Sequence, residues 1–287
     1  MQTHTDELHE QLSRNSTPYQ DPLNKVSWQS LERDQFWLPQ PAISLYGLNE
    51  YQSLPMAQRR ALSQFEFLNF VEAALCLEHL FIKRIAQTLH KIHCRNSRDI
   101  YRLHELREET GHVLMFLELM RRCGLALPHN KFRSLNTAKW LGKYLPYDSL
   151  LFWIAVIIGE ELADRLNRFI RKFPHQVNPA IYDIVSVHII DEARHISHAR
   201  ALIEEELKIA NRLYLKLIQP LVHHLYRSFI RAYFFPPARV YELAGLTPGK
   251  RWVLAARNNA HRLKFVDECV NTSLHVLRDN KFTLSWR

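Results

Sequence analysis

Glycine is scarce in this chain, and that scarcity limits the folds open to it more than any other feature. The 287 residues contain 7 glycines against 13 prolines, and long stretches consist of Leu, Ala, Ile, Arg, Glu and His. Both all-β folds, which need many turns, and nucleotide-binding sheets, which need glycine loops, are disfavoured. Hydrophobic residues make up 47% and charged residues 23%, as in globular proteins. The sequence therefore predicts an all-α fold.

Helix start and stop signals divide most of the chain into long helices. Residues 1–52 lack a steady hydrophobic period, which predicts an irregular N-terminal arm over the surface, with one short helix at most and no visible chemistry. Residues 53–287 are expected to form a single domain. Its core is a bundle over about 53–210, and additional C-terminal helices occupy 211–287. The expected helices are 53–92 with a break near Ser63, 98–123, 147–172, 179–210, 212–234 with a kink at Pro220, one before Gly245, and 250–277.

Composition also bears on the partners and the compartment. The net charge of +9 could suit nucleic acid, but no basic run or aromatic RNA-binding motif supports such a partner. The longest apolar run, Leu150 to Gly159, is shorter than the about 20 residues that a membrane span needs. Residues 1–16 are polar and lack the apolar segment of a signal peptide. We therefore expect a cytoplasmic protein with neither nucleic acid nor membrane as a partner.

The four cysteines form no C-x-x-C pair, so neither a disulfide framework nor a thiolate zinc site is expected. They are predicted to be free thiols in the core: Cys76, Cys94, Cys123 and Cys269.

The fourth long helix carries the strongest chemical signal. His188, Glu192 and His195 are spaced i, i+4 and i+7, so all three project from one stripe, which Ile184 and Leu202 continue toward the core. A lone histidine on an apolar face is usually a hydrogen-bonded core residue. Two histidines and a glutamate together would be costly to bury without a cation. The pattern therefore favours a metal site.

The second long helix repeats part of this spacing. Glu109 and His112 form a second E-x-x-H, and Phe116 and Leu119 continue their stripe. One E-x-x-H is common by chance. Two of them, each on a long amphipathic helix of a four-helix pattern, indicate a shared metal centre much more specifically.

The first long helix offers Glu78. It fills the one gap in an apolar series with alternating steps of three and four residues, so its carboxylate is predicted to point inward. The competing Glu72 lies on a more polar stripe.

The third long helix is less clear. Glu161 lies beside the apolar face of Leu162 and Leu166, whereas Glu160 points nearly opposite and shares its side with Asp164. Glu161 is therefore the expected ligand and Glu160 a supporting polar residue, although either glutamate could take the position.

Together the four helices supply one Glu from each of two helices and an E-x-x-H from each of the other two. This is the arrangement of ferritin-like di-iron and di-manganese carboxylate proteins. Carboxylates with imidazoles and no thiolate suit iron, with manganese as the alternative, better than copper or structural zinc. Glu109 and Glu192 are expected to bridge the ions. The predicted metal ligands are Glu78, Glu109, His112, Glu161, His188, Glu192 and His195.

The local sequences D-E-A-R-H at 191–195 and E-E-T-G-H at 108–112 resemble those of the ferritin-like di-iron oxygenases. In that superfamily the carboxylate before each E-x-x-H glutamate commonly orients the histidine of the opposite helix. The resemblance implies that Asp191 accepts a hydrogen bond from His112, and Glu108 from His195. Such contacts fix the histidine tautomer and raise ligand basicity.

The additional His188 narrows the resemblance. The motif H-x-x-x-E-x-x-H is similar to that of the p-aminobenzoate N-oxygenase family, whose di-iron site carries a third histidine on this helix. The likeness covers roughly residues 53–208 by helix order and ligand spacing. It implies two iron ions, O2 as co-substrate, and oxidation of an amine to hydroxylamine, nitroso or nitro products.

The resemblance also implies partners. No flavin or nicotinamide motif is present, so an external electron donor or reductase is expected. The substrate would be a small-molecule amine, free or bound to a carrier protein, and we expect a homodimer. The alternatives are a ferritin-like hydroxylase or desaturase acting on C–H bonds, and an iron-handling ferritin-like protein.

Overall fold

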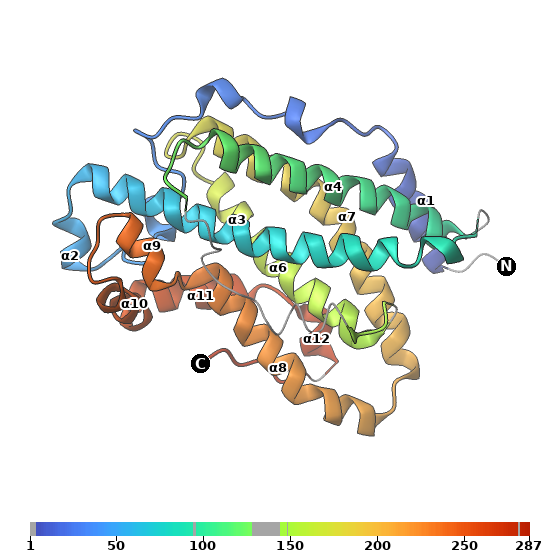
Figure 1. The fold of residues 1–287 in the computed structure, drawn as a ribbon. Helices are drawn as coiled ribbons and strands as arrows, with labels where there is room; N and C mark the ends of the chain where they lie inside the picture. Colours follow the sequence, from blue (N-terminus) through green and yellow to red (C-terminus); the bar gives the residue numbers. More distant parts are fainter. Residues whose placement is uncertain (1–3, 94–95, 128–143, 148, 281) are drawn as a thin grey trace.

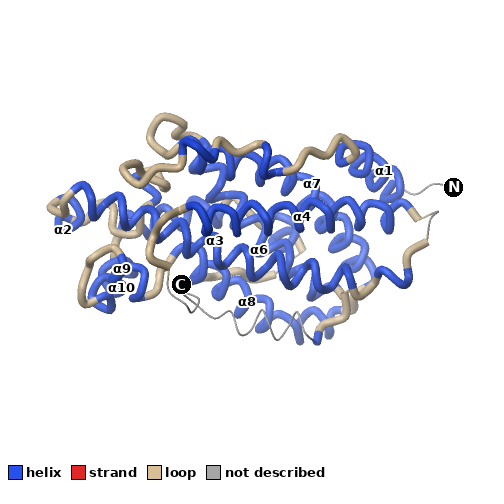
Figure 2. The backbone as a smooth tube through the Cα atoms, turned by 45° about the horizontal axis from the view of Figure 1, so that its top comes forward, coloured by secondary structure: helices blue, strands red, loops and turns tan. Residues whose placement is uncertain are grey.

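The computed structural model describes residues 4–93, 96–127, 144–147, 149–280 and 282–287. Within these ranges the regular secondary structure is entirely helical, which confirms the all-α fold (Figures 1 and 2). None of the described helices is both long and apolar enough to cross a membrane.

Four long helices form the core bundle: α3 (Met56–Ala86), α4 (Ser97–Arg122), α6 (Leu150–Arg171) and α7 (Pro179–Ile209). Helix α3 packs against α4, and α6 packs against α7 (Figure 1). Their order and approximate bounds agree with the sequence prediction. The expected break near Ser63 is wrong, because α3 continues through it and the Ser63 hydroxyl donates to the Arg60 carbonyl within the helix.

Side-chain caps explain where three of these helices begin. The Asn96 side chain accepts from the amides of Arg98 and Asp99 at the start of α4. Ser149 caps α6, and Asn178 caps α7 directly before Pro179. Each cap satisfies amides that have no partner within the helix, and proline suits the first helical position because its nitrogen carries no hydrogen.

The C-terminal helices pack outside the bundle: α8 (Arg212–Phe234), α9 (Ala238–Leu243), α10 (Gly249–Asn258), α11 (Ala260–Asn271) and α12 (His275–Asp279). The single helix expected over 250–277 is wrong. Asn259 adopts an extended conformation between α10 and α11, and its side chain accepts from the His261 amide to start a new helix. Leu274, in the left-handed region with φ 59°, separates α11 from α12.

The N-terminal arm contributes to the core rather than only covering it. It contains α1 (His4–Ser16) and α2 (Asn49–Gln52), three 3-10 turns, and irregular segments between them. Helix α1 packs on α4 and α7. Trp37 is completely buried in the same hydrophobic core as the bundle. The Asn259 side chain donates to the carbonyls of Ser44 and Tyr46, which ties the arm to the C-terminal helices.

Three of the four cysteines lie in the described part of the chain. Cys76, Cys123 and Cys269 are buried and form no disulfide with one another, as expected. Cys94 lies outside the described residues.

Candidate metal centre

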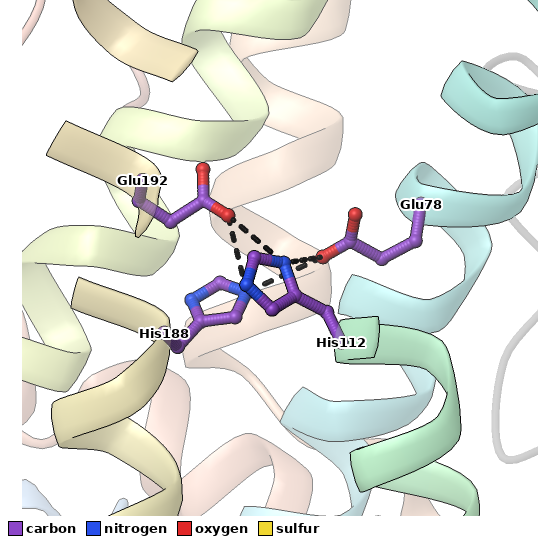
Figure 3. Close-up of side chains that lie close together, drawn as sticks. All are labelled: Glu78, His112, His188 and Glu192. Carbon is purple, nitrogen blue, oxygen red and sulfur yellow. Dashed lines mark hydrogen bonds and ion pairs between the residues drawn. The ribbon is translucent and has the colours of Figure 1, made fainter. Parts of the chain in front are cut away.

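Helix α7 directs its three predicted ligands into the bundle. His188, Glu192 and His195 are buried, because their spacing repeats at nearly whole helical turns. Glu109 and His112 of α4 and Glu78 of α3 face them, likewise buried. Figure 3 shows the side chains of Glu78, His112, His188 and Glu192 converging from the three helices.

The donor atoms form three overlapping groups, and within each group they lie within 4.8 Å of one another. The groups are Glu78, His112, His188 and Glu192; Glu109, His112, Glu192 and His195; and Glu78, Glu109 and Glu160. Seven buried side chains from four helices therefore share one small volume.

Glu109 and Glu192 occupy the middle of this volume. His112 Nδ1 lies 3.5 Å from Glu109 Oε2 and 3.4 Å from Glu192 Oε1. His195 Nδ1 lies 3.0 Å from Glu109 Oε1 and 3.4 Å from Glu192 Oε1. Each of these two carboxylates thus faces the histidines of both E-x-x-H motifs, which is the position expected of a bridging ligand.

The outward-facing nitrogens of these histidines contact the expected carboxylates. His112 Nε2 lies 3.2 Å from Asp191 Oδ2, and His195 Nε2 lies 3.0 Å from Glu108 Oε2. Burial opposes protonation of His112 and His195, but the surrounding carboxylates outweigh it and raise the pKa of both rings, so both are protonated without a metal. If a cation took the place of the Nδ1 protons, the Nε2–H groups would donate outward and the Nδ1 lone pairs would face the cluster. Burial opposes ionisation of Asp191, but the hydrogen bond from His112 and the charges of His112, His195 and Arg194 together outweigh burial and lower the pKa of this carboxyl below its usual value.

His188 is oriented by Asn167 of α6. His188 Nε2 lies 3.3 Å from Glu78 Oε1 and 3.4 Å from Glu192 Oε1, and Nδ1 lies 3.0 Å from Asn167 Nδ2. Asn167 Oδ1 has no hydrogen-bond partner among the described residues. Rotation of the Asn167 side-chain amide by 180° would exchange its nitrogen and oxygen, and Oδ1 would then accept a hydrogen bond from His188 Nδ1–H. The Nε2 lone pair would then face the cluster. Burial lowers the pKa of His188 to about 4, so the ring is neutral and suited to bind a cation.

The third-helix prediction is wrong, because Glu160 rather than Glu161 joins the cluster. Glu161 Oε1 accepts from Arg200 Nε at 3.0 Å, and Oε2 accepts from the Leu274 amide at 2.5 Å. Nearly every residue of α6 is buried, since the C-terminal helices cover its outer side. An apolar stripe therefore cannot identify which face of α6 meets the other long helices. On α3 the expectation holds: Glu78 lies in the cluster, and Glu72 is partly exposed.

The carboxylates differ in their pKa values. Burial raises the pKa of Glu78 and of Glu160 well above the usual value, and the neighbouring carboxylates add to this shift. Burial also opposes ionisation of Glu109 and Glu192, but the charge of His195 helps to lower both of their pKa values. The cluster therefore holds two carboxylates that remain ionised and two that resist ionisation without an added positive charge.

Hydrogen bonding within the cluster is incomplete. Both oxygens of Glu109 and of Glu192, one oxygen each of Glu78 and Glu160, and Nδ1 of His112 and of His195 are buried without a hydrogen-bond partner among the described residues. His195 Nδ1 and Glu109 Oε1 lie close but lack hydrogen-bond geometry. Buried polar atoms are almost always paired, so this concentration of converging acceptors fits a site for cations.

The sequence matches the family described as "P-aminobenzoate N-oxygenase AurF" over residues 2–280. The chain belongs to this family. Two uncharacterized proteins, one from Mycobacterium bovis and one from Mycobacterium tuberculosis, are each 26% identical to this AurF-family protein over 244 residues, covering 80% of its chain and 68% of theirs. The family match includes the N-terminal arm, beyond the segment in which the sequence motifs lie.

Solved structures share the fold of this AurF-family protein. One R2-like ligand-binding oxidase variant with an anaerobically reconstituted Mn/Fe cofactor has a TM-score of 0.56 at 15% identity, covering 99% of this chain and 94% of that chain. Another variant, with a non-activated Mn/Mn cofactor, has a TM-score of 0.51 at 17% identity, covering 95% and 93%. The architecture is thus that of a ferritin-like bundle with additional C-terminal helices.

Sequence reasoning missed two residues that support the site of this AurF-family protein. Arg194 Nη2 donates to Glu108 Oε1 at 2.7 Å and to Asp191 Oδ1 at 2.5 Å, so one guanidinium holds both orienting carboxylates. Its place between Glu192 and His195 in D-E-A-R-H was a usable signal. Asn167 gave a weaker signal, because it is one polar residue on a helix that also carries several charged residues.

The reassignment of Glu161 gives a first testable prediction. We expect Glu161→Gln to lower the free energy of unfolding by about 1–3 kcal/mol, because Arg200 loses its ionised partner and a buried acceptor is weakened. Metal content should stay unchanged, because this carboxylate faces away from the cluster. Urea denaturation and metal analysis measure the two quantities. The exposed Glu204→Gln on α7 is the control and should change neither, and loss of metal in Glu161→Gln would contradict the reassignment.

Proposed function

We propose that this AurF-family protein is a non-haem di-iron oxygenase that uses O2 to oxidise the nitrogen of a small-molecule amine. The observation that carries the proposal is the convergence of buried carboxylate and imidazole atoms that have no other partner. Family membership supports an oxygenase, and the Mn/Fe and Mn/Mn cofactors of the structural neighbours support a two-metal site.

The residues present fit two iron ions, with manganese as the alternative metal. Glu109 and Glu192 would bridge, and the remaining ligands would be Glu78, His112, Glu160, His188 and His195. The bound metal pair supplies the activation of O2 and its two-electron chemistry. Asp191, Glu108 and Asn167 hold the imidazoles in place, so the geometry exists before the metals arrive.

Buried aromatic side chains lie beside the centre. The Phe116 ring lies 5.3 Å from the His188 ring, centroid to centroid.

Burial raises the pKa of Tyr233 well above its usual value, and the carboxylates of Glu160 and Glu78 add to this shift. Its hydroxyl has no hydrogen-bond partner among the described residues. Tyr233 therefore keeps its proton, and we expect its O–H to donate a hydrogen bond to a bound substrate.

His188 tests the proposal. Ferrous protein is exposed to O2 with p-aminobenzoate or another arylamine and a chemical reductant, and the products are analysed by mass spectrometry. We expect hydroxylamine, nitroso or nitro products from the wild type. In His188→Ala, N-oxidation should fall by about tenfold or more while the bundle still folds, because the third imidazole is lost and its neighbours reorganise.

The exposed His175→Ala serves as the matched control and should retain full activity. Unchanged N-oxidation in His188→Ala would show that the reaction does not need the His188 imidazole. Carbon-oxidised products would favour a hydroxylase or desaturase instead, and iron deposition without substrate oxidation would favour iron handling. Supply of the amine by a carrier protein, a dedicated reductase, a homodimer and a cytoplasmic location remain predictions.

A further inference from the structure

A second group of buried titratable side chains lies next to the metal centre. Glu105 precedes Glu109 by four residues on α4, and His198 follows His195 by three residues on α7. His9 reaches them from α1 of the N-terminal arm. Glu105 is 1% exposed, and His198 and His9 are completely buried. The arm, which was expected to carry no chemistry, thus places an imidazole inside the protein.

The three groups form a line. His9 Nε2 lies 2.9 Å from His198 Nδ1 within hydrogen-bond geometry, and His198 Nε2 lies 3.8 Å from Glu105 Oε2. The remaining atoms of the line, His9 Nδ1, His198 Nε2 and both Glu105 oxygens, have no hydrogen-bond partner among the described residues. In each imidazole one nitrogen takes part in the hydrogen bond between His9 and His198. The other nitrogen, His9 Nδ1 or His198 Nε2, can accept or donate a further hydrogen bond.

The inner end of the line faces the metal centre. The charged groups that act most strongly on Glu105 are His195, Glu109, Glu108 and Arg102. His198 packs between the rings of Tyr101 and Trp153, at centroid distances of 5.0 and 5.1 Å. A purely structural cluster would be expected to satisfy its buried polar atoms, and this one does not.

The outer end of the line lies near solvent. The charged groups around His9 are Arg98, Glu205, Arg102 and Asp6. Arg98 and Glu205 form an ion pair in which each side chain is 32% exposed. Solvent therefore reaches an ion pair whose charges act on His9, while the line itself stays buried.

We propose that His9, His198 and Glu105 form a proton-transfer path between solvent beside α1 and the metal centre, a proposal that rests on the oxygenase function proposed above. Conversion of an amine and O2 to a hydroxylamine and water consumes two protons and two electrons. An external electron donor supplies the electrons. The ligands of the centre are buried from bulk solvent, so the protons need a route through the protein.

The transfer is balanced at each atom. A proton that arrives at His9 Nδ1 releases the Nε2 proton to His198 Nδ1, and His198 Nε2–H then passes its proton to Glu105 after a small rotation closes the 3.8 Å separation. Burial lowers the pKa of His9 to about 4 and that of His198 well below its usual value, so both rings rest neutral. Burial raises the pKa of Glu105 well above its usual value, so it rests as an acid. Glu105 therefore gives its own proton toward the metal centre before its carboxylate accepts the next proton from His198.

Three conservative variants of the full-length, iron-loaded protein test the path. His9→Gln, His198→Gln and Glu105→Gln keep polar atoms in place but cannot relay a proton. Ferrous protein is mixed with O2 and reductant, and O2 consumption is followed in H2O and in D2O. We expect each variant to keep its iron and its helix content, to consume O2 about tenfold more slowly or worse, and to show an altered solvent isotope effect.

Chemical rescue separates proton transfer from structure. In His9→Ala, which opens space beside the partly exposed Arg98–Glu205 pair, added imidazole should restore much of the O2 consumption. In Glu105→Gln it should not, because the gap lies deeper. The matched control is His104→Gln on α4, whose imidazole contacts Arg107 outside the line and whose loss should change neither rate nor isotope effect.

The outcomes distinguish the two proposals. If iron-loaded wild type consumes O2 and the Gln variants match it in both rate and isotope effect, the path is overturned while the oxygenase function stands. If the wild type itself consumes no O2 with any amine or reductant, the oxygenase function fails and the path fails with it. Slow variants that imidazole cannot rescue and that keep the wild-type isotope effect would also overturn the path.

Discussion

Glu192→Ala is expected to reduce the iron content of the purified protein from about two ions per chain to less than one. Glu192 Oε1 lies 3.4 Å from a ring nitrogen of each of His112, His188 and His195, so this oxygen is at the middle of the cluster. Two unit charges 4 Å apart repel by about 4 kcal/mol at an effective dielectric constant of ~20, and two divalent ions repel roughly four times as strongly. The bridging carboxylate offsets much of this repulsion.

Iron content is measured by elemental analysis after loading with ferrous iron under anaerobic conditions. Glu109→Ala should give the same result, because Glu109 also faces both His112 and His195. The exposed Glu204→Ala on the same helix as Glu192 is the control and should keep both ions. Full iron content in Glu192→Ala, or a single zinc in the wild type, would contradict the two-metal assignment.

Metal removal is expected to lower the melting temperature by roughly 15 °C. A ligand present at 1,000 times its dissociation constant stabilises the folded state by about 4 kcal/mol per site, or about 8 kcal/mol for two sites. One kcal/mol corresponds to about 2 °C in a protein of this size. Without metal, the carboxylates of Glu78, Glu109, Glu160 and Glu192 converge in a buried volume with incomplete hydrogen bonding.

Differential scanning calorimetry of the chelator-treated and iron-loaded protein measures this shift. The Glu192→Ala variant provides the internal control, because chelator should hardly change its melting temperature. A wild type with the same melting temperature in both states would mean that the cluster binds no metal in solution with useful affinity.

The sequence predicted most of the candidate centre because two of its helices carry unambiguous spacing. On α4 and α7 the E-x-x-H residues fall on apolar stripes, and both stripes face the cluster. Glu78 was found by the same reasoning, as one acid in an otherwise apolar series. The helix order followed from caps and from proline at the start of α7. Local signals were sufficient wherever one side of a helix faces the core and another faces solvent.

The remaining features depend on contacts between distant segments. Helix α6 is buried on nearly all sides, so periodicity could not separate Glu160 from Glu161. The Arg200 guanidinium and the Leu274 amide, both outside α6, hold Glu161 away from the cluster. His9 lies in a short polar helix whose sequence gives no reason to bury an imidazole. Its position follows only from the packing of α1 against α4 and α7.

The contacts of Asn259 also set an order on the assembly of the protein during synthesis. Asn259 Nδ2 donates to the carbonyl of Ser44, 215 residues earlier, and Arg262 donates to the carbonyl of Ala42, 220 residues earlier. The buried carbonyls of Ala42 and Ser44 thus have no partners until about 220 further residues have been synthesised. Pairing across such sequence separation is slow, and an arm exposed meanwhile shows apolar side chains such as Trp37 to other chains. Slow translation of the segment that contains α10 and α11 would lengthen that exposure, so the yield of folded protein should depend on how quickly this segment is translated.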